Sequence, residues 1–171
     1  MDASVNTLAV VVLAFVTLQR LAELIIARRN TARLLARGAV EVAPEHYPLI
    51  VAVHIAWLAG LWLLAIQHTP SWPLLGVFAL LQAGRLWVLA TLGERWTTRI
   101  IVLPSEALIR RGPYRFVAHP NYLVVAAEIA VLPLAFGLAG FAALFTLLNA
   151  GVLWVRIGAE SRALNRMPQR S

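Results

Sequence analysis

The residues best suited to chemistry lie together in one polar segment, residues 110–122, which separates two long apolar runs. It contains three arginines, two tyrosines, a histidine, a glycine and two prolines. Pro120 favours a helix that begins there, and a helix N-terminus among arginines suits an anionic or carboxylate-bearing ligand. Aromatic faces can hold a flat heterocycle or, through cation–π attraction, a sulfonium. The segment therefore predicts a site for a polar ligand at a membrane surface.

The walls of such a site can come from aromatic residues that are near one another in sequence: Trp96, Tyr114, Phe116, Tyr122 and Trp154. The alternative interpretation is an interfacial belt, in which aromatic and arginine side chains at the lipid headgroups only anchor the protein. The sequence contains no GxGxxG, HExxH or GxSxG motif, so the common soluble nucleotide sites and hydrolase motifs lack support.

A second polar pair, Arg156 and Glu160, lies near the C-terminus at the i, i+4 spacing of one helical face. An exposed pair at this spacing contributes only about 0.3–0.5 kcal/mol to stability. If the helix instead folds over residues 110–122, Glu160 can accept hydrogen bonds from a ligand's hydroxyl or amine groups.

The elements that must position these residues are membrane-spanning helices. Of the 171 residues, 60% are hydrophobic and only 13% are charged, which is too apolar for an ordinary soluble domain. Cysteine is absent, so disulfides, thiolate metal sites and a cysteine nucleophile are excluded. A span of about 20 apolar residues matches a hydrocarbon core of about 30 Å. The predicted spans are residues 5–27, 47–67, 72–92, 121–136 and 139–155.

The arginines give the predicted spans an orientation. All fifteen basic residues are arginine, thirteen of them follow the first, third or fifth span, and the connections 67–72 and 137–140 contain none. The positive-inside rule then places the N-terminus outside and the C-terminus in the cytoplasm. We therefore expect an all-α integral membrane protein of about five transmembrane helices, with membrane lipid and no nucleic acid as a partner.

Two arginines, Arg20 and Arg85, fall inside predicted spans, where each costs about 2.5–3.5 kcal/mol on insertion scales. Glu23 lies three residues after Arg20 on the same helical face, and Glu128 in the fourth span can face Arg85. These residues form either structural ion pairs or the lining of a polar cavity that opens to the cytoplasm.

Two further features concern the loops. The β-branched, apolar residues 97–103 predict a short strand. His46 and His54 are eight residues apart, which does not match a compact ligand set, so we expect no metal site.

The run Gly112-Pro-Tyr-Arg-Phe-Val-Ala-His-Pro-Asn-Tyr122, a helical hairpin and Arg156-Ile-Gly-Ala-Glu160 resemble the isoprenylcysteine carboxyl methyltransferase family. The resemblance covers roughly residues 96–164. The N-terminal half, with residues 94–104, looks more like a small bacterial subgroup, some members of which are thought to methylate alkylpyrones made by type III polyketide synthases. Ala118 and Ser161 depart from the family pattern, which has arginine and a second glutamate there.

The resemblance implies a methyltransferase that binds S-adenosylmethionine at the cytoplasmic face, below the final hairpin, in a bacterial inner membrane. Within a single membrane domain, 1–171, the family-like core would be residues 93–166. Carried over by position, the cofactor-binding residues are Gly112, Tyr114, Arg115, His119, Pro120, Tyr122, Arg156 and Glu160. The acceptor would be a lipophilic small molecule that enters from the bilayer, and the candidates for orienting it are the catalytic residues Arg85, Glu23 and Glu128.

Two alternatives stay open from sequence. One is an NADPH-dependent membrane reductase, because sterol-reductase-like proteins have a similar C-terminal hairpin. The other is a non-catalytic membrane scaffold, which would have no cofactor affinity and would tolerate His119→Ala. The sequence also leaves open the acceptor, the need for a general base, and the oligomeric state.

Overall fold

Five helices make up most of the structure, a computed structural model that describes residues 5–103 and 109–165, the side chains of residues 161 and 163–165 excepted. Four helices are long and apolar enough to cross a membrane, and α4 is a shorter apolar helix. The expectation of an all-α membrane protein is confirmed. The helices are α1 (Thr7–Ala36), α2 (Tyr47–Leu64), α3 (Trp72–Leu92), α4 (Pro120–Ala135) and α5 (Ala139–Asn165).

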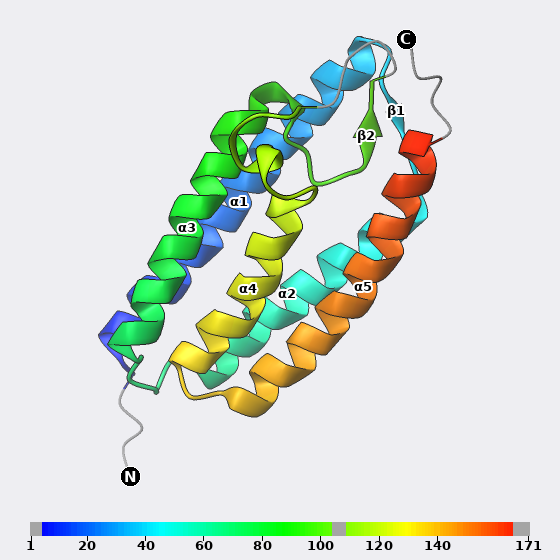
Figure 1. The fold of residues 1–171 in the computed structure, drawn as a ribbon. Helices are drawn as coiled ribbons and strands as arrows, with labels where there is room; N and C mark the ends of the chain where they lie inside the picture. The colour runs from blue at the N-terminus through cyan, green and yellow to red at the C-terminus, as the bar shows by residue number, and fades with distance from the viewer. Residues whose placement is uncertain (1–4, 104–108, 166–171) are drawn as a thin grey trace.

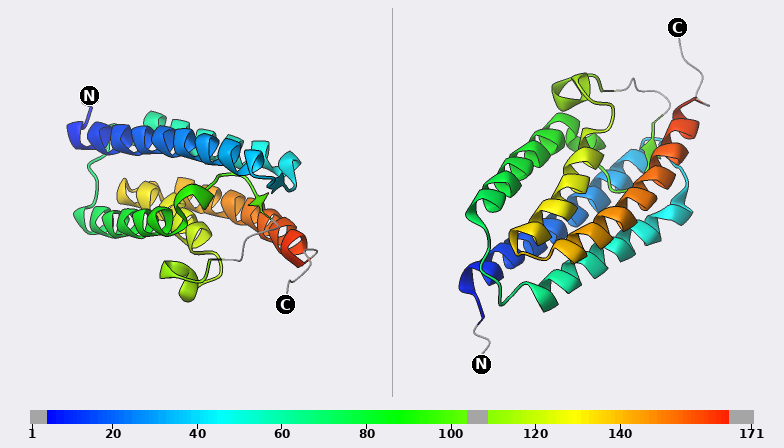
Figure 2. Two further views of the ribbon diagram at one scale, coloured as in Figure 1. Left: turned by 90° about the horizontal axis from the view of Figure 1, so that it is seen from above. Right: turned by 60° about the horizontal axis from the view of Figure 1, so that its bottom comes forward.

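The helices form two layers. Seen from above, α1 and α2 lie in one layer and α3, α4 and α5 in the other (Figure 2). Within the second layer α4 lies between α3 and α5 (Figure 1). This central position places both ends of α4 against its neighbours, so residues at its start can meet residues from α5.

Two helices are longer than the predicted spans. The prediction ended the first span at residue 27, but α1 continues to Ala36. Arginine, alanine and leucine in this stretch are good helix formers, and the helix ends just before Gly38, which has a φ of +87°. Likewise α5 continues past residue 155 to Asn165. Charged residues end the part of a helix that fits in lipid; they do not end the helix.

The remaining boundaries differ little from the prediction. Helix α3 has the predicted bounds, α2 ends three residues early, and α4 is displaced by one residue. The predicted strand at 97–103 is reduced to β2 (Ile101–Val102), which pairs antiparallel with β1 (Val40–Glu41). Three short 3₁₀ turns complete the loops: η1 (Pro44–His46), η2 (Gly93–Arg95) and η3 (Gly112–Arg115).

The two ends of the bundle differ in the hydrogen bonds that close them and in their charge. At one end the amide of Asn6 donates to the carbonyl of Ile66, and that of Ser71 donates to Ala135, both at 2.7 Å. At the other end Asn30 donates to the carbonyls of Gly93 and Trp96, at 3.2 and 2.8 Å. The second end, called the loop end below, carries the described arginines outside the spans. Arg166 and Arg170, also assigned to this end by sequence, lie outside the described residues.

The apolar core lies between the two layers. Trp57 is 1% exposed, and its indole nitrogen donates to the carbonyl oxygen of Ile129 at 3.2 Å. Leu13, Leu61 and Phe136 are also fully buried and belong to the same cluster. Within a bilayer, helices associate through close van der Waals packing rather than by removing apolar surface from water, so the packing of this cluster holds α1 and α2 against α4 and α5.

Candidate functional site

The turn η3 brings the polar segment of the sequence onto the end of α3. Gly112 begins the turn with a φ of +57°, and a Cβ at this position would collide with the side chain of Thr91. Pro113 is buried beside it. Glycine is required here for two reasons, because an L side chain disfavours this φ and Thr91 occupies the space. The contact fixes the start of the segment that leads to α4.

Three side chains from α4 and α5 form a hydrogen-bonded chain at the loop end. The Tyr122 hydroxyl donates to Oε2 of Glu160 at 2.7 Å, and Nε of Arg156 donates to the same hydroxyl at 2.8 Å. Tyr122 is in the first turn of α4, while Arg156 and Glu160 are one turn apart on α5. Arg156 is only 7% exposed, so the interpretation of these two residues as a solvated surface pair is wrong.

His119 lies next to this chain of hydrogen bonds, and Tyr114 is near enough for the charge of Glu160 to affect it. The His119 ring stacks on the Tyr122 ring, with centroids 5.2 Å apart, and its Nδ1 is 3.7 Å from Oε2 of Glu160. Burial, together with the negative charge of Glu160, raises the pKa of Tyr114 to about 12, so its phenol is neutral at physiological pH. A phenol, an imidazole, a guanidinium and a carboxylate thus meet at one place, with the Tyr114 phenol within electrostatic range of the carboxylate.

The remaining predicted site residues are less close to this group. Pro120 is buried at the first position of α4, where His119 immediately precedes the helix, as predicted. Arg115 is exposed, and its guanidinium lies 5.8 Å from the ring centroid of Phe116. The side chain of Ser161 lies outside the described residues.

The predicted aromatic walls are only partly present. Trp154 is 83% exposed and Phe116 is 73% exposed, so neither encloses the site. Trp96 is buried in a small cluster against which Tyr114 packs, so it supports the Tyr114 side chain. Helical periodicity explains the difference for Trp154, because it lies two residues from the buried Arg156 and therefore on a different face of α5.

Asn121 is a residue that the sequence analysis did not single out. Its Oδ1 is buried and has no hydrogen-bond partner among the described residues. A buried acceptor without a partner is costly, so the atom is suited to a donor from a ligand or water. In the sequence, its position between Pro120 and Tyr122 is the feature that could have identified it as a candidate site residue.

A second polar cluster lies inside the bundle, among α1, α3 and α4. Nε of Arg85 donates to Oε1 of Glu128 at 2.8 Å, and the NH2 group of Arg85 pairs with Oε2 of Glu128. Arg85 also contacts Glu23 at 3.0 Å, and Arg20 contacts Glu23 at 2.9 Å and Glu128 at 2.6 Å. The two predicted pairings, Arg20 with Glu23 and Arg85 with Glu128, are confirmed.

Two glutamines, which the sequence analysis missed, extend this cluster. Gln82 donates to Oε1 of Glu128 at 2.8 Å, and Gln19 donates to Gln82 at 2.7 Å and to Glu23 at 3.0 Å. Two arginines and two glutamates balance in charge, which is the arrangement that buried charges require. The exposed fractions are 0% for Glu128 and 2% for Arg85, so the structure supports the interpretation of these residues as structural ion pairs.

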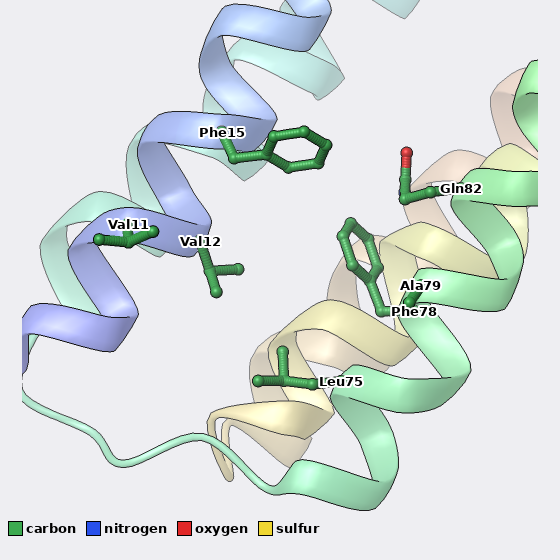
Figure 3. Close-up of a pocket in the computed structure, with 7 residues that line it drawn as sticks. All are labelled: Val11, Val12, Phe15, Leu75, Phe78, Ala79 and Gln82. Carbon is green, nitrogen blue, oxygen red and sulfur yellow. The ribbon is translucent and has the colours of Figure 1, made fainter.

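The cavity beside the cluster is apolar. A groove of about 390 Å³ lies between α1 and α3. Figure 3 shows Phe15 of α1 and Phe78 of α3 pointing toward each other across it, with Gln82 at one end. The apolar lining differs from the polar cavity that was the alternative prediction for Arg20 and Arg85. The lining residues are Val11, Val12, Phe15, Leu75, Phe78, Ala79 and Gln82.

The two histidines of the first loop and α2 are far from a metal-binding arrangement. Nδ1 of His54 is 2.8 Å from the carbonyl oxygen of Ile50, one turn earlier in α2, while His46 ends η1. Among the residues that the structure describes, no group of three histidine, aspartate or glutamate side chains could hold a metal ion.

Comparisons with known proteins give a family match and two similar chains. A family model described as "Isoprenylcysteine carboxyl methyltransferase (ICMT) family" matches residues 74–166, from α3 to the end of α5. The chain is 39% identical to the uncharacterized protein YpbQ of Bacillus subtilis, covering 89% of this chain and 94% of that protein. It is 28% identical to an uncharacterized protein of Haemophilus influenzae, covering 86% and 90%. No solved structure matches.

Proposed function

Since the chain belongs to the isoprenylcysteine carboxyl methyltransferase (ICMT) family, a family of membrane methyltransferases, we propose that it transfers a methyl group from S-adenosylmethionine to an oxygen of a lipophilic acceptor. The observation that carries this proposal is the meeting of Tyr122, Arg156 and Glu160 beside His119 at the loop end. All four residues lie within the matched range.

The described side chains fit the groups that S-adenosylmethionine presents. A carboxylate such as Glu160 can accept from ribose hydroxyls or from the amino group, and the Arg156 guanidinium suits the carboxylate of the methionyl part. The ring of Tyr114 offers an aromatic face to a cationic sulfonium, whereas the Tyr122 ring is already stacked with His119 and has the Arg156 guanidinium 5.5 Å from its centroid. The unpartnered Oδ1 of Asn121 offers one further acceptor for a donor of the ligand.

When bound, the cofactor supplies an electrophilic methyl group on a positively charged sulfur. The protein's contribution is to bind and orient, since well-positioned reactants account for much of the acceleration in displacement reactions. The stacked rings of His119 and Tyr122 and the chain from Arg156 to Glu160 restrain one another's positions, and such preorganisation lowers the cost of binding a ligand. Gly112 and Arg115 shape the loop that borders this arrangement.

The acceptor is proposed to be a lipophilic molecule with a hydroxyl, enol or carboxylate group, such as an alkylpyrone-like or prenylcysteine-like compound. A carboxylate or enolate needs no proton removal before it attacks, whereas a neutral enol or phenol does. Such molecules dissolve in the bilayer and would reach the site laterally, while the cofactor enters from the aqueous side. We propose that this side is the cytoplasm of a bacterial inner membrane, as the arginines at the loop end favour.

The buried cluster is proposed to support the acceptor site. Glu128 is six residues after Tyr122 on α4, about 9 Å along the helix, so the cluster fixes the rotation of the helix that carries Tyr122. Arg85, Glu23 and Glu128 are satisfied by one another, and within the cluster only Nε of Arg20 and Oε1 of Gln19 are buried without a partner. A polar head of an acceptor that reached the cluster would find these two atoms unpaired.

The first experiment is calorimetric binding of S-adenosylmethionine and its demethylated product to purified protein in nanodiscs, with NADPH as the competing cofactor. Glu160→Ala and His119→Ala are measured alongside, with Trp154→Phe on the exposed face of α5 as the matched control. We expect the wild type and the control to bind S-adenosylmethionine, and both site variants to bind it weakly while keeping wild-type melting temperatures.

Two results would overturn the proposal. Folded wild-type protein that binds NADPH and not S-adenosylmethionine would favour a reductase. Binding that neither Glu160→Ala nor His119→Ala weakens would place the cofactor elsewhere. If binding is found, a screen of lipophilic acceptors follows, and unchanged methylation by a well-folded Arg85→Ala protein would exclude Arg85 from orienting the acceptor.

A further inference from the structure

The outer side of the turn η3 exposes arginines and apolar side chains together. Arg110, Arg111 and Arg115 are all exposed, and none of them forms an ion pair with a described side chain. Next to them Phe116 is 73% exposed and Val117 is 43% exposed. Basic and apolar groups side by side on one loop are suited to the boundary between lipid headgroups and acyl chains.

The chain length places this loop at that boundary. Val117 is three residues before Pro120, where the apolar helix α4 begins, and three residues span at most about 10 Å. Val117 therefore lies close to headgroup depth whenever α4 is in the bilayer, with Arg115 two residues before it. In the ribbon, η3 projects outward from the layer of α3 and α4, on the side away from α1 and α2 (Figure 2).

The positive charges of the loop favour anionic lipids over zwitterionic lipids. A zwitterionic surface would accommodate Phe116 and Val117 but would offer no net charge to the three guanidinium groups. A guanidinium pairs well with a phosphate oxygen, often through two hydrogen bonds, and arginines close to a membrane are attracted by anionic lipids. The occupant that satisfies both the apolar and the basic side chains is an anionic phospholipid.

The same turn continues inward to the candidate site. Tyr114 is in η3 between Pro113, which is buried, and Arg115, which is exposed, and it packs against the cluster of Ala27, Val88 and Trp96. Contacts that fix the exposed residues of η3 therefore also restrain the position of Tyr114, and of His119 five residues later.

We propose that residues 110–117 bind the phosphate groups of anionic phospholipids, and that this binding holds η3 in the position where Tyr114 borders the cofactor site. The second half rests on the proposed function, and the first half does not. Since the native chain has no cysteine, a single Val117→Cys substitution allows one environment-sensitive fluorophore to be attached at the loop.

The experiment uses the full-length labelled protein in nanodiscs of phosphatidylcholine alone and of phosphatidylcholine mixed with phosphatidylglycerol. The test variant adds Arg110→Gln and Arg111→Gln, and the control adds Arg28→Gln and Arg29→Gln, which removes the same charge from exposed positions on α1. We expect emission to shift to shorter wavelength in the anionic discs for the parent and the control. The test variant loses this shift, and added salt reverses it in the parent.

Three results would overturn the proposal: an equal shift in both kinds of disc, loss of the shift in the control variant, or the same shift in phosphatidylcholine discs on adding inorganic phosphate, which would indicate a soluble anion. S-adenosylmethionine affinity measured in the same discs tests the second half, and we expect weaker binding without anionic lipid. Absence of cofactor binding in both discs would speak against the proposed function and leave the fluorescence result standing.

Discussion

The hydroxyl of Tyr122 donates a hydrogen bond of 2.7 Å to Oε2 of Glu160 and thereby joins the start of α4 to the end of α5. The same oxygen accepts from Nε of Arg156, so one phenol separates a cation from an anion that are one turn apart on α5. The hydroxyl therefore ties the positions of Arg156 and Glu160 to the start of α4.

Removing this hydroxyl tests its role. We expect Tyr122→Phe to bind S-adenosylmethionine about tenfold more weakly, because hydrogen bonds to charged groups contribute about 1.5–3 kcal/mol. Calorimetry in nanodiscs measures the change, with Tyr47→Phe as a matched control that removes a phenol bonded to Thr98 elsewhere at the loop end. Equal affinities of Tyr122→Phe and the wild type would show that the bridge does not organise the site.

Loss of Arg85 should destabilise the bundle. Arg85→Met leaves Glu23 and Glu128 with one arginine between them, and breaking a buried pair costs about 3–5 kcal/mol. The double variant Arg85→Met, Glu128→Leu leaves the neutral pair of Arg20 and Glu23. Thermal unfolding in one detergent should therefore show a melting temperature for the double variant above that of Arg85→Met. The reverse order would mean that the cluster does not act through charge balance.

Substitution of Gly112 should move the turn η3. Alanine at this position meets both the unfavourable φ, worth about 1–2 kcal/mol, and the side chain of Thr91. We expect Gly112→Ala to weaken S-adenosylmethionine binding and Thr91→Ala to restore part of it, since only the collision is relieved. Gly140→Ala, in α5 with open space around it, is the control. Full affinity in Gly112→Ala would show that the turn tolerates displacement.

The phenol of Tyr114 should ionise at a higher pH than the phenol of an ordinary tyrosine. Burial and the charge of Glu160 raise its pKa to about 12, above the usual value of about 10. The neutral form is therefore favoured in the folded state, and the stability it contributes is present below about pH 10 and lost as the pH rises toward 12. In an ultraviolet titration, Tyr114→Phe should remove a component that ionises near pH 12. Removal of a component near pH 10 would contradict this expectation.

Much of the fold could be predicted from hydropathy and arginine placement. Helix α3 was predicted to the residue, because Pro73 favours a helix start and the apolar run ends at Gly93. The end of α1 was not predicted, since a residue such as Arg28 marks where lipid ends and leaves the helix free to continue to Ala36. The ion pairs were predicted because an arginine in hydrocarbon needs a carboxylate, and few were available.

By itself, the sequence determined that this is a helical membrane protein and that polar residues gather in segments 110–122 and 156–160, because composition and helical period are local properties. Only the tertiary structure decided that Tyr122 lies between Arg156 and Glu160, that Trp154 faces outward, and that Gln19 and Gln82 join the buried cluster. These facts depend on how α4 is rotated between α3 and α5. That rotation is set by packing and by the pairing of Arg85 with Glu128, which join residues distant in the sequence.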